Sequence, residues 1–293
     1  MSSAHLESLN QDGFVLVPSI LTPEQITTLR NASAEVIDVA RSGKWPFVRT
    51  LPKQFPPWTV APGANPAEGG IWGVQFLMHP DLPHSKTFIS NYFSTPIISI
   101  VKELLECEDE DLVMELFNLL IRPDKDFELR WHRDDIPATA TAEEELERLR
   151  QPAWSAQWNL ALYEDDSLIV VPASHKRART QIERDADPFE KGIPGEIRVQ
   201  MKPGDAVFYN NNILHRGAYV SSKERMTLHG SIGHKDGSRL RARNVLQHGI
   251  GEWVQDIDLS GLEGKEKERA LAMRKLLMKL GAENTDVGFS LEE

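Results

Sequence analysis

The chain has 293 residues, a formal net charge of −11 and an isoelectric point near 5.4. An acidic surface repels nucleic-acid phosphates and anionic lipids, so neither nucleic acid nor membrane is expected as a main partner. No apolar run approaches the ~20 residues of a transmembrane helix, and the first residues lack the features of a signal peptide. Because Cys107 is the one cysteine, no intramolecular disulfide can form, and we expect a cytoplasmic protein.

The N-terminal part predicts a short strand followed by a helix. Residues Gly13–Val17 are rich in the aromatic and β-branched side chains that favour strands. Thr22 and Gln25 match a capping box, with Pro23 at the first helical position, so a helix is expected from there to about Ala40.

Residues 44–90 show no clear periodicity and combine many Pro and Gly residues with three tryptophans. A loop of this length in a compact domain is usually functional or disordered, and disordered segments are poor in aromatic residues. We expect it to wrap over the core, to form a wall of the substrate pocket, or to act as a lid. Trp72 and Phe76 are the residues we expect to contact an apolar substrate. A second helix is predicted next, over Pro96–Glu106, from its helical spacing of apolar residues.

Short β-rich runs separated by turn residues dominate the middle of the chain, which is typical of a sandwich or barrel. One helix interrupts them over Thr141–Arg150. Its many Glu and Arg side chains indicate a solvated surface helix beside the site, or a lid over 138–151. The predicted strands are Leu112–Ile121, Glu128–His132, Ala156–Tyr163, Leu168–Val171, Ile197–Met201, Ala206–Tyr209 and Met226–Ile232.

The last predicted element is an amphipathic helix over Glu263–Leu280, whose apolar stripe contains Leu271, Leu276, Leu277 and Leu280. It either docks on the main domain or forms a homodimer contact. We expect a single domain over 1–293, with a core at about 10–240 and a helical extension at about 241–293.

The residues that indicate chemistry are His132, Asp134 and His215. Alternate side chains share a face of a strand, so His132 and Asp134 point together while Asp135 points away. His215 must approach from another strand. Two histidines and one carboxylate hold Fe(II) at three corners and leave its other positions open for oxygen chemistry. A lone His-x-Asp is weak evidence, and the prediction depends on the order His-x-Asp, a long β-rich stretch, His and then Arg.

Arg225 follows the second histidine at the start of a predicted strand. Its guanidinium can hold the distal carboxylate of 2-oxoglutarate through two parallel hydrogen bonds. Thr227 would face the same way and donate a further hydrogen bond. The alternative is a surface arginine in a charged turn. His229 and His234 lie nearby and are interpreted as structural, or as supporting the ligands.

At this point the chain resembles the phytanoyl-CoA dioxygenase family. The resemblance implies a double-stranded β-helix (jelly-roll) core with flanking helices, bound Fe(II), 2-oxoglutarate as co-substrate and O2. It also implies that His132, Asp134 and His215 are the iron ligands and that Arg225 clamps 2-oxoglutarate. Ala173 replaces the glycine usual in the family. The blocks that carry the resemblance are 12–17, 21–25, 131–134, 170–176, 202–208, 215–217 and Arg225.

Other pocket candidates are expected on the strands beside the metal motif. Asn118 lies where family members often place a polar group against the co-substrate. Trp158 is either a core residue or a wall of the co-substrate pocket. Arg122 binds a substrate carboxylate or makes a surface ion pair.

The predicted function is a dioxygenase that hydroxylates an unactivated C–H bond of a small-molecule metabolite and decarboxylates 2-oxoglutarate to succinate. The resemblance implies that Asp134 favours hydroxylation, because related halogenases lack this carboxylate. Three alternatives remain at this stage. They are a non-haem iron oxidase that does not use 2-oxoglutarate, a cupin-like metal-dependent isomerase or hydrolase, and a binding module without turnover.

Overall fold

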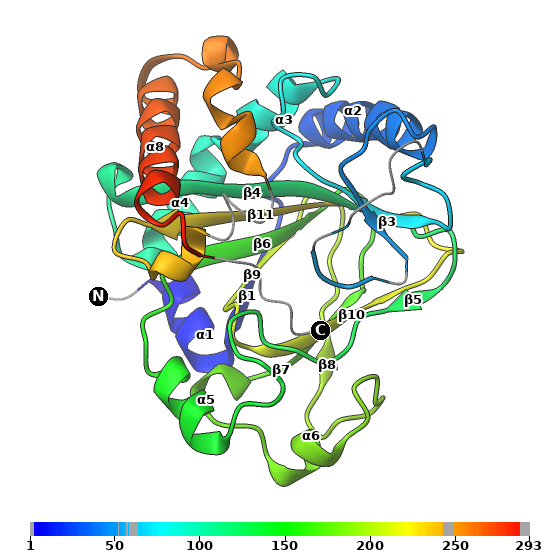
Figure 1. Cartoon of the computed structure of the whole chain (residues 1–293), viewed down its shortest axis with the longest axis vertical. Coiled ribbons are helices and arrows are strands. Elements are labelled where there is room, and N and C mark those ends of the chain that lie inside the picture. The colour runs from blue at the N-terminus through cyan, green and yellow to red at the C-terminus, as the bar shows by residue number, and fades with distance from the viewer. Residues whose placement is uncertain (1–2, 52, 57, 59–63, 243–248, 288–293) are drawn as a thin grey trace.

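The computed structural model describes residues 3–51, 53–56, 58, 64–242 and 249–287. Within these residues, two antiparallel sheets form the core (Figure 1). The larger sheet has the spatial order β1 (Phe14–Val17), β9 (Ala206–Tyr209), β6 (Ser155–Ala161), β11 (Met226–His234), β4 (Leu112–Ile121), β3 (Ile71–Val74) and β2 (Val48–Thr50). The smaller sheet has the order β5 (Phe127–Glu128), β10 (Leu214–Tyr219), β7 (Leu168–Val171) and β8 (Ile197–Arg198).

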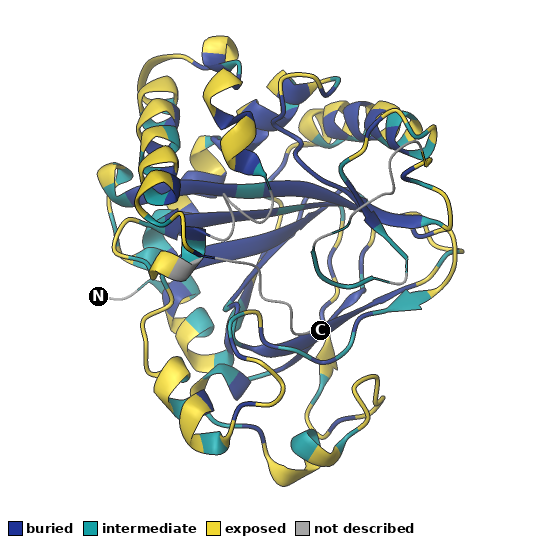
Figure 2. Cartoon of the chain, in the orientation of Figure 1, coloured by how far each residue is buried: buried dark blue, intermediate teal, exposed yellow. Residues whose placement is uncertain are grey.

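The sheets are arranged as a jelly roll, which confirms the predicted fold class. The central strands β4, β6 and β11 are buried over nearly their whole length, as Figure 2 shows. This burial agrees with the near-continuous apolar sequence of β4. The helices cover the outer face of the larger sheet, so its inner face is left to form a cavity with the smaller sheet (Figure 1).

Four helices lie on the outer side of the larger sheet (Figure 1). They are α2 (Pro23–Arg41), α3 (Ser85–Tyr92), α4 (Thr95–Leu105) and α8 (Gly264–Glu283). The start of α2 confirms the predicted capping box. The Gln25 backbone N–H donates to Thr22 Oγ1 at 3.3 Å, and the Thr22 N–H donates to Gln25 Oε1 at 2.9 Å. Pro23 costs nothing at this end because the first N–H groups of a helix have no partner inside it.

The structure corrects three expectations about the N-terminal part and the middle of the chain. A helix that was not predicted, α1 (Ala4–Asp12), precedes β1. Residues 44–90 are not irregular throughout, because they contribute β2, β3 and α3. The strand expected over Glu128–His132 stops at Glu128 and resumes only as a single bridge between His132 and His215. The cause is that the Trp131 N–H donates to the Pro188 carbonyl, outside the sheet.

The helix α5 (Ala142–Leu149) forms where expected and lies at the surface, as predicted, but one of its glutamates is buried. Glu145 on this helix is fully buried. Its carboxylate accepts from Arg179 Nη1 at 2.6 Å, contacts Arg184, and lies 3.5 Å from Arg133 Nε. Arginines from other segments therefore anchor α5 beside the smaller sheet.

The C-terminal helix α8 packs on β4 through Ala270, Met273 and Leu277, which are fully buried. Leu271 was expected in the apolar stripe, but it is 42% exposed. In the parts of the chain that the structure describes, no helix is both long and apolar enough to cross a membrane.

Candidate metal and co-substrate site

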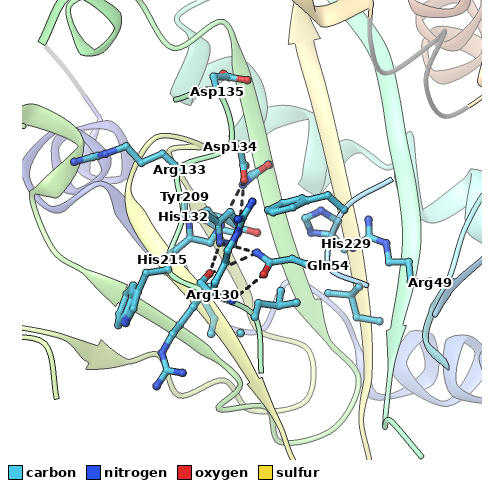
Figure 3. A pocket seen from close by; sticks show the side chains of 18 of the residues that line it. Arg49, Gln54, Arg130, His132, Arg133, Asp134, Asp135, Tyr209, His215 and His229 are labelled. Atoms are coloured by element: carbon cyan, nitrogen blue, oxygen red, sulfur yellow. Dashed lines mark hydrogen bonds and ion pairs between the residues drawn. The ribbon is translucent and has the colours of Figure 1, made fainter. Parts of the chain in front are cut away.

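Three predicted ligand residues meet in the cavity between the sheets (Figure 3). His215 lies on β10, and His132 lies opposite it through two backbone hydrogen bonds of 3.0 Å. Asp134 follows two residues later. Its Oδ1 atom lies 3.5 Å from His132 Nε2 and 3.7 Å from His215 Nε2. One ligand atom from each residue lies within 4.8 Å of the others, so the three can hold one metal ion.

Backbone carbonyls fix both imidazoles in the orientation that a metal requires. His132 Nδ1 lies 2.8 Å from the Arg130 carbonyl, and His215 Nδ1 lies 2.9 Å from the Ile213 carbonyl. A carbonyl only accepts, so each Nδ1 carries the proton and each Nε2 offers a lone pair to the cavity. Burial, followed by repulsion from His215, lowers the pKa of His132 well below its usual value, which favours the neutral form that binds metals.

The carboxylate of Asp134 is also oriented by a neighbour. Gln157 on β6 donates from Nε2 to Asp134 Oδ2 at 2.9 Å, which leaves Oδ1 facing the two histidines. Figure 3 shows Arg133, the residue between the ligands, pointing away from the group, as strand alternation predicts. Its guanidinium donates to the carbonyls of Ser174 and Arg177 at 3.0 Å.

Arg225 lies at the start of β11, is 6% exposed and lines the same cavity. Its Nε donates to Asp165 Oδ2 at 3.0 Å, and its Cζ lies 4.2 Å from the centroid of the Tyr219 ring. The Nη1 atom is buried and has no hydrogen-bond partner among the described residues. A buried donor without a partner is costly, so this nitrogen fits an acceptor such as a carboxylate brought by a ligand.

Thr227 faces the same way as Arg225, and its hydroxyl donates to the same Asp165 oxygen. Although burial alone would raise the pKa of Asp165, Arg225 and hydrogen bonds from Ser167 and Thr227 lower it to about 2. Asp165 is therefore a charged anchor for Arg225. The sequence did not indicate it, because it lies in a turn 60 residues before Arg225.

Two of the softer candidates are fully buried and are not among the residues that line the cavity. Trp158 is fully buried, packs against Gly230 and Tyr92, and projects from β6 on the face opposite Gln157 and Asn159, which line the cavity. Asn118 is also fully buried. Its Oδ1 accepts from the Phe76 N–H at 3.0 Å, and its Nδ2 has no partner among the described residues.

His229 on β11, which the sequence suggested as a structural or supporting residue, faces the cavity. Its Nδ1 donates to Asn159 Oδ1 at 2.9 Å. Burial, then the charges of Arg49 and Arg225, lower its pKa to about 3, so His229 is neutral. Of the loop residues proposed for substrate contact, Trp72 lines the cavity, whereas Phe76 belongs to the core.

A second group of metal-ligating residue types, Cys107, Asp111 and His234, lies near the start of β4 and the end of β11. Burial raises the pKa of the Cys107 thiol to about 11, so it stays protonated. Asp111 is already paired with Lys235 at 2.5 Å. This group is a poor metal site, because a thiol binds metals as the thiolate.

A two-histidine, one-carboxylate group inside a jelly-roll core is typical of non-haem iron oxygenases, and this chain is of that class. The phytanoyl-CoA dioxygenase (PhyH) family model matches residues 9–227, so the chain belongs to this family. The suspected resemblance is confirmed, and with it the enzyme class that uses Fe(II), 2-oxoglutarate and O2. None of the curated proteins matches the sequence.

Solved structures share the fold at low sequence identity. AviO1 from Streptomyces viridochromogenes Tue57 is 16% identical, with a TM-score of 0.56 over 80% of this chain and 96% of that one. HygX from Streptomyces hygroscopicus, solved with nickel and 2-oxoglutarate, is 16% identical, with a TM-score of 0.56 over 80% and 87%. EctD from S. alaskensis, solved with 2-oxoglutarate and 5-hydroxyectoine, is 16% identical, with a TM-score of 0.52 over 80% and 76%.

Proposed function

We propose that this protein hydroxylates an unactivated C–H bond of a small-molecule metabolite, with Fe(II) held by His132, Asp134 and His215. The observation that carries the proposal is the convergence of His132 Nε2, His215 Nε2 and Asp134 Oδ1, with both Nδ1 protons bound to backbone carbonyls. The overall reaction converts substrate, 2-oxoglutarate and O2 into hydroxylated substrate, succinate and CO2.

Bound iron and 2-oxoglutarate would supply the oxidising chemistry, and the protein residues position the reactants. Gln157 holds Asp134 so that one oxygen faces the metal position. Arg225, anchored by Asp165, offers its free Nη1 to the distal carboxylate of 2-oxoglutarate. Thr227 supports this clamp through Asp165. The buried, unpartnered nitrogen of Arg225 favours a carboxylate co-substrate over an oxidase that needs none.

Several finer predictions belong to the proposal. Asn118 lies beneath the cavity floor, between Leu116 and Leu120, which line it, and its free Nδ2 supports a contact with the co-substrate. Trp158 would then act only from behind the strand, by packing. A single domain over 1–293, a homodimer contact through α8 and a cytoplasmic location stay predictions from the sequence.

The test is Asp134→Ala. We expect this change to abolish substrate-dependent succinate formation, because removing the carboxylate leaves only two protein ligands. Anaerobic addition of Fe(II) and 2-oxoglutarate to the wild type should give a metal-to-ligand charge-transfer band that the variant lacks. Circular dichroism checks that the variant is folded. Turnover at the wild-type rate in Asp134→Ala would refute the assignment of the metal site.

A further inference from the structure

The cavity is cationic although the whole chain is acidic. Among the described residues, seven arginines and two aspartates line it, against a net charge of −11 for the chain. Four of the arginines are paired with carboxylates: Arg133, Arg216, Arg225 and Arg241. Arg148 donates to the Asp135 carbonyl, and Arg130 lies over the Phe55 ring. Arg49 differs, because its side chain makes no hydrogen bond or ion pair with the described residues, and its Nε is buried without a partner among them.

Arg49 lies on the inner face of the larger sheet. Arg49 lies opposite Gly73, which lies opposite Leu120, and Leu120 lies opposite Thr227. Residues opposite each other in antiparallel strands share a face, so Arg49 stands on the cavity side in the row that contains Thr227. A Cβ added at Gly73 would lie 3.0 Å from Arg49 Cδ. The missing side chain at Gly73 therefore leaves room for Arg49 to lie across the sheet.

Aromatic rings hold the guanidinium in place without neutralising it. Arg49 Cζ lies 5.0 Å from the ring centroid of Trp72 and 5.1 Å from that of Trp58. Trp72 stacks on Tyr219, the ring that supports Arg225. Arg49 and Arg225 thus rest on different rings of one aromatic wall, and Figure 3 shows Arg49 on the side of His229.

Nothing near Arg49 in the sequence offers a counter-charge. The side chain is buried, with 9% of the residue exposed, and its Nε has no partner. The segment 51–63, which includes residues outside the described part, contains neither Asp nor Glu. Burial lowers the pKa of Arg49 to about 10, so it is still a cation at neutral pH. A buried cation without a partner is destabilising, and this favours a role that requires the charge.

We propose that Arg49 binds the carboxylate of an anionic substrate, so that the substrate class of this oxygenase is the small organic acids. This inference rests on the proposed function, because Arg225 already accounts for the carboxylate of the co-substrate. A guanidinium held against aromatic rings keeps donors that can make two parallel hydrogen bonds to a carboxylate. The cavity has about 1000 Å³, at the upper end of the range for small-molecule sites, so it has room for a second molecule.

The experiment compares Arg49→Gln with the wild type, both loaded anaerobically with Fe(II) and 2-oxoglutarate. The probes are acetate, benzoate and phenylacetate, each with its uncharged amide, titrated by calorimetry. We expect at least one carboxylate to bind saturably and its amide much more weakly. Arg49→Gln should lower the affinity for the carboxylate by about tenfold or more, since a hydrogen bond to a charged group contributes roughly 1.5–3 kcal/mol. Arg49→Lys, which keeps the charge, should recover part of this affinity.

Two controls separate this inference from the proposed function. Arg122→Gln changes an exposed arginine outside the cavity and should leave carboxylate binding as in the wild type. Arg225→Gln should lower the affinity for 2-oxoglutarate by about tenfold or more, whereas Arg49→Gln should lower it by less than about threefold. Arg49→Gln should also melt no lower than the wild type, because it removes an unpaired buried charge.

Three results would overturn the inference. The first is that none of the carboxylates binds the wild type. The second is equal carboxylate affinity in Arg49→Gln and the wild type. The third is a loss of 2-oxoglutarate affinity in Arg49→Gln as large as in Arg225→Gln, which would assign Arg49 to the co-substrate. Failure of 2-oxoglutarate to bind the wild-type protein would instead refute the proposed function.

Discussion

Asp165 determines what Arg225 can offer to a ligand. Its carboxylate accepts hydrogen bonds from Arg225 Nε and from the Thr227 hydroxyl. Arg225 Nη1 is left without a partner among the described residues. The pair is almost fully buried, so its charges are little screened by solvent. Arg225 is therefore fixed in direction and only partly neutralised before any ligand binds.

We predict that Asp165→Asn lowers the free energy of unfolding by about 3 kcal/mol, because it leaves Arg225 buried without its counter-ion. 2-Oxoglutarate should recover part of this loss by supplying an anion at Nη1. Urea denaturation with and without 2-oxoglutarate measures both effects. A variant that is as stable as the wild type, or that 2-oxoglutarate does not stabilise, would contradict this role for Asp165.

His175 is a second, partly buried group whose charge depends on the fold. A Cβ at Gly13, which has φ of +84°, would lie 2.5 Å from His175 Nδ1, so the imidazole packs directly against this turn. Burial, followed by repulsion from Lys176, lowers the pKa of His175 to about 4. The folded protein therefore keeps this histidine neutral at pH values where an unfolded chain protonates it.

The pH dependence follows from this difference. Below the unfolded pKa of about 6.5, His175 is protonated in the unfolded state but stays neutral in the folded state. The free energy of unfolding therefore falls as the pH drops from about 6.5 to 4. We predict that His175→Gln removes roughly 1–2 kcal/mol of this fall, after allowing for partial exposure. Urea denaturation at pH 7 and pH 5 measures it. His84→Gln, which changes an exposed histidine, is the control; identical pH slopes in His175→Gln and the wild type would contradict the prediction.

The sequence predicted residues that belong to motifs better than residues that support them. His132, Asp134, His215 and Arg225 follow in a recognisable order, and the structure brings them into one cavity. Asp165 and Arg49 carry no local signal, because their importance depends on which strands become neighbours. Tertiary pairing of this kind cannot be read from spacing along one strand.

At the scale of elements, α5 is anchored beside the site by ion pairs. Its Glu145 is the common partner of Arg133, Arg179 and Arg184, and Arg133 stands between two of the proposed metal ligands. The sequence predicted the helix from a segment rich in Glu and Arg, but not the burial of one glutamate among several. The missing information was again the position of arginines that are distant in the sequence.

We predict that Glu145→Gln lowers the free energy of unfolding by about 3 kcal/mol, because three buried or partly buried arginines lose their shared anion. It should also weaken Fe(II) binding, since Arg133 holds the segment of His132 and Asp134. Urea denaturation and anaerobic metal titration measure the two effects. Glu143→Gln, on the exposed face of the same helix, is the matched control and should resemble the wild type. Equal stability of both variants would show that the ion-pair cluster contributes little.

The strands that the sequence predicted best are the ones with runs of apolar residues. The bounds of β4, β7 and β9 were predicted without error, whereas β10 was not predicted as a strand and β2 and β3 lay inside an expected loop. The missed strands carry Gly or charged residues in place of an apolar run, and they form here because neighbouring strands complete their hydrogen bonds. β10 contains Gly217, whose missing Cβ leaves room for the Tyr219 ring, and such a glycine reads as a turn signal in the sequence.

For the whole molecule, the larger sheet depends on its helical cover. The side chains of α8 that face β4 are fully buried, while Met278 on the outer face of the helix is 41% exposed. The C-terminal segment therefore packs on the same sheet whose inner face carries the site. This packing supports a single domain over 1–293, and cooperative unfolding is the property that tests it.

We predict that Leu277→Ala lowers the free energy of unfolding by about 2–5 kcal/mol, because a fully buried leucine is replaced by a cavity. If the chain is one domain, circular dichroism and tryptophan fluorescence should report the same shifted midpoint in urea, since the helices and the aromatic wall unfold together. Met278→Ala, the exposed neighbour, should remain within about 0.5 kcal/mol of the wild type. Separate midpoints for the two signals, with only the helical signal shifted by Leu277→Ala, would show that α8 unfolds independently of the sheets.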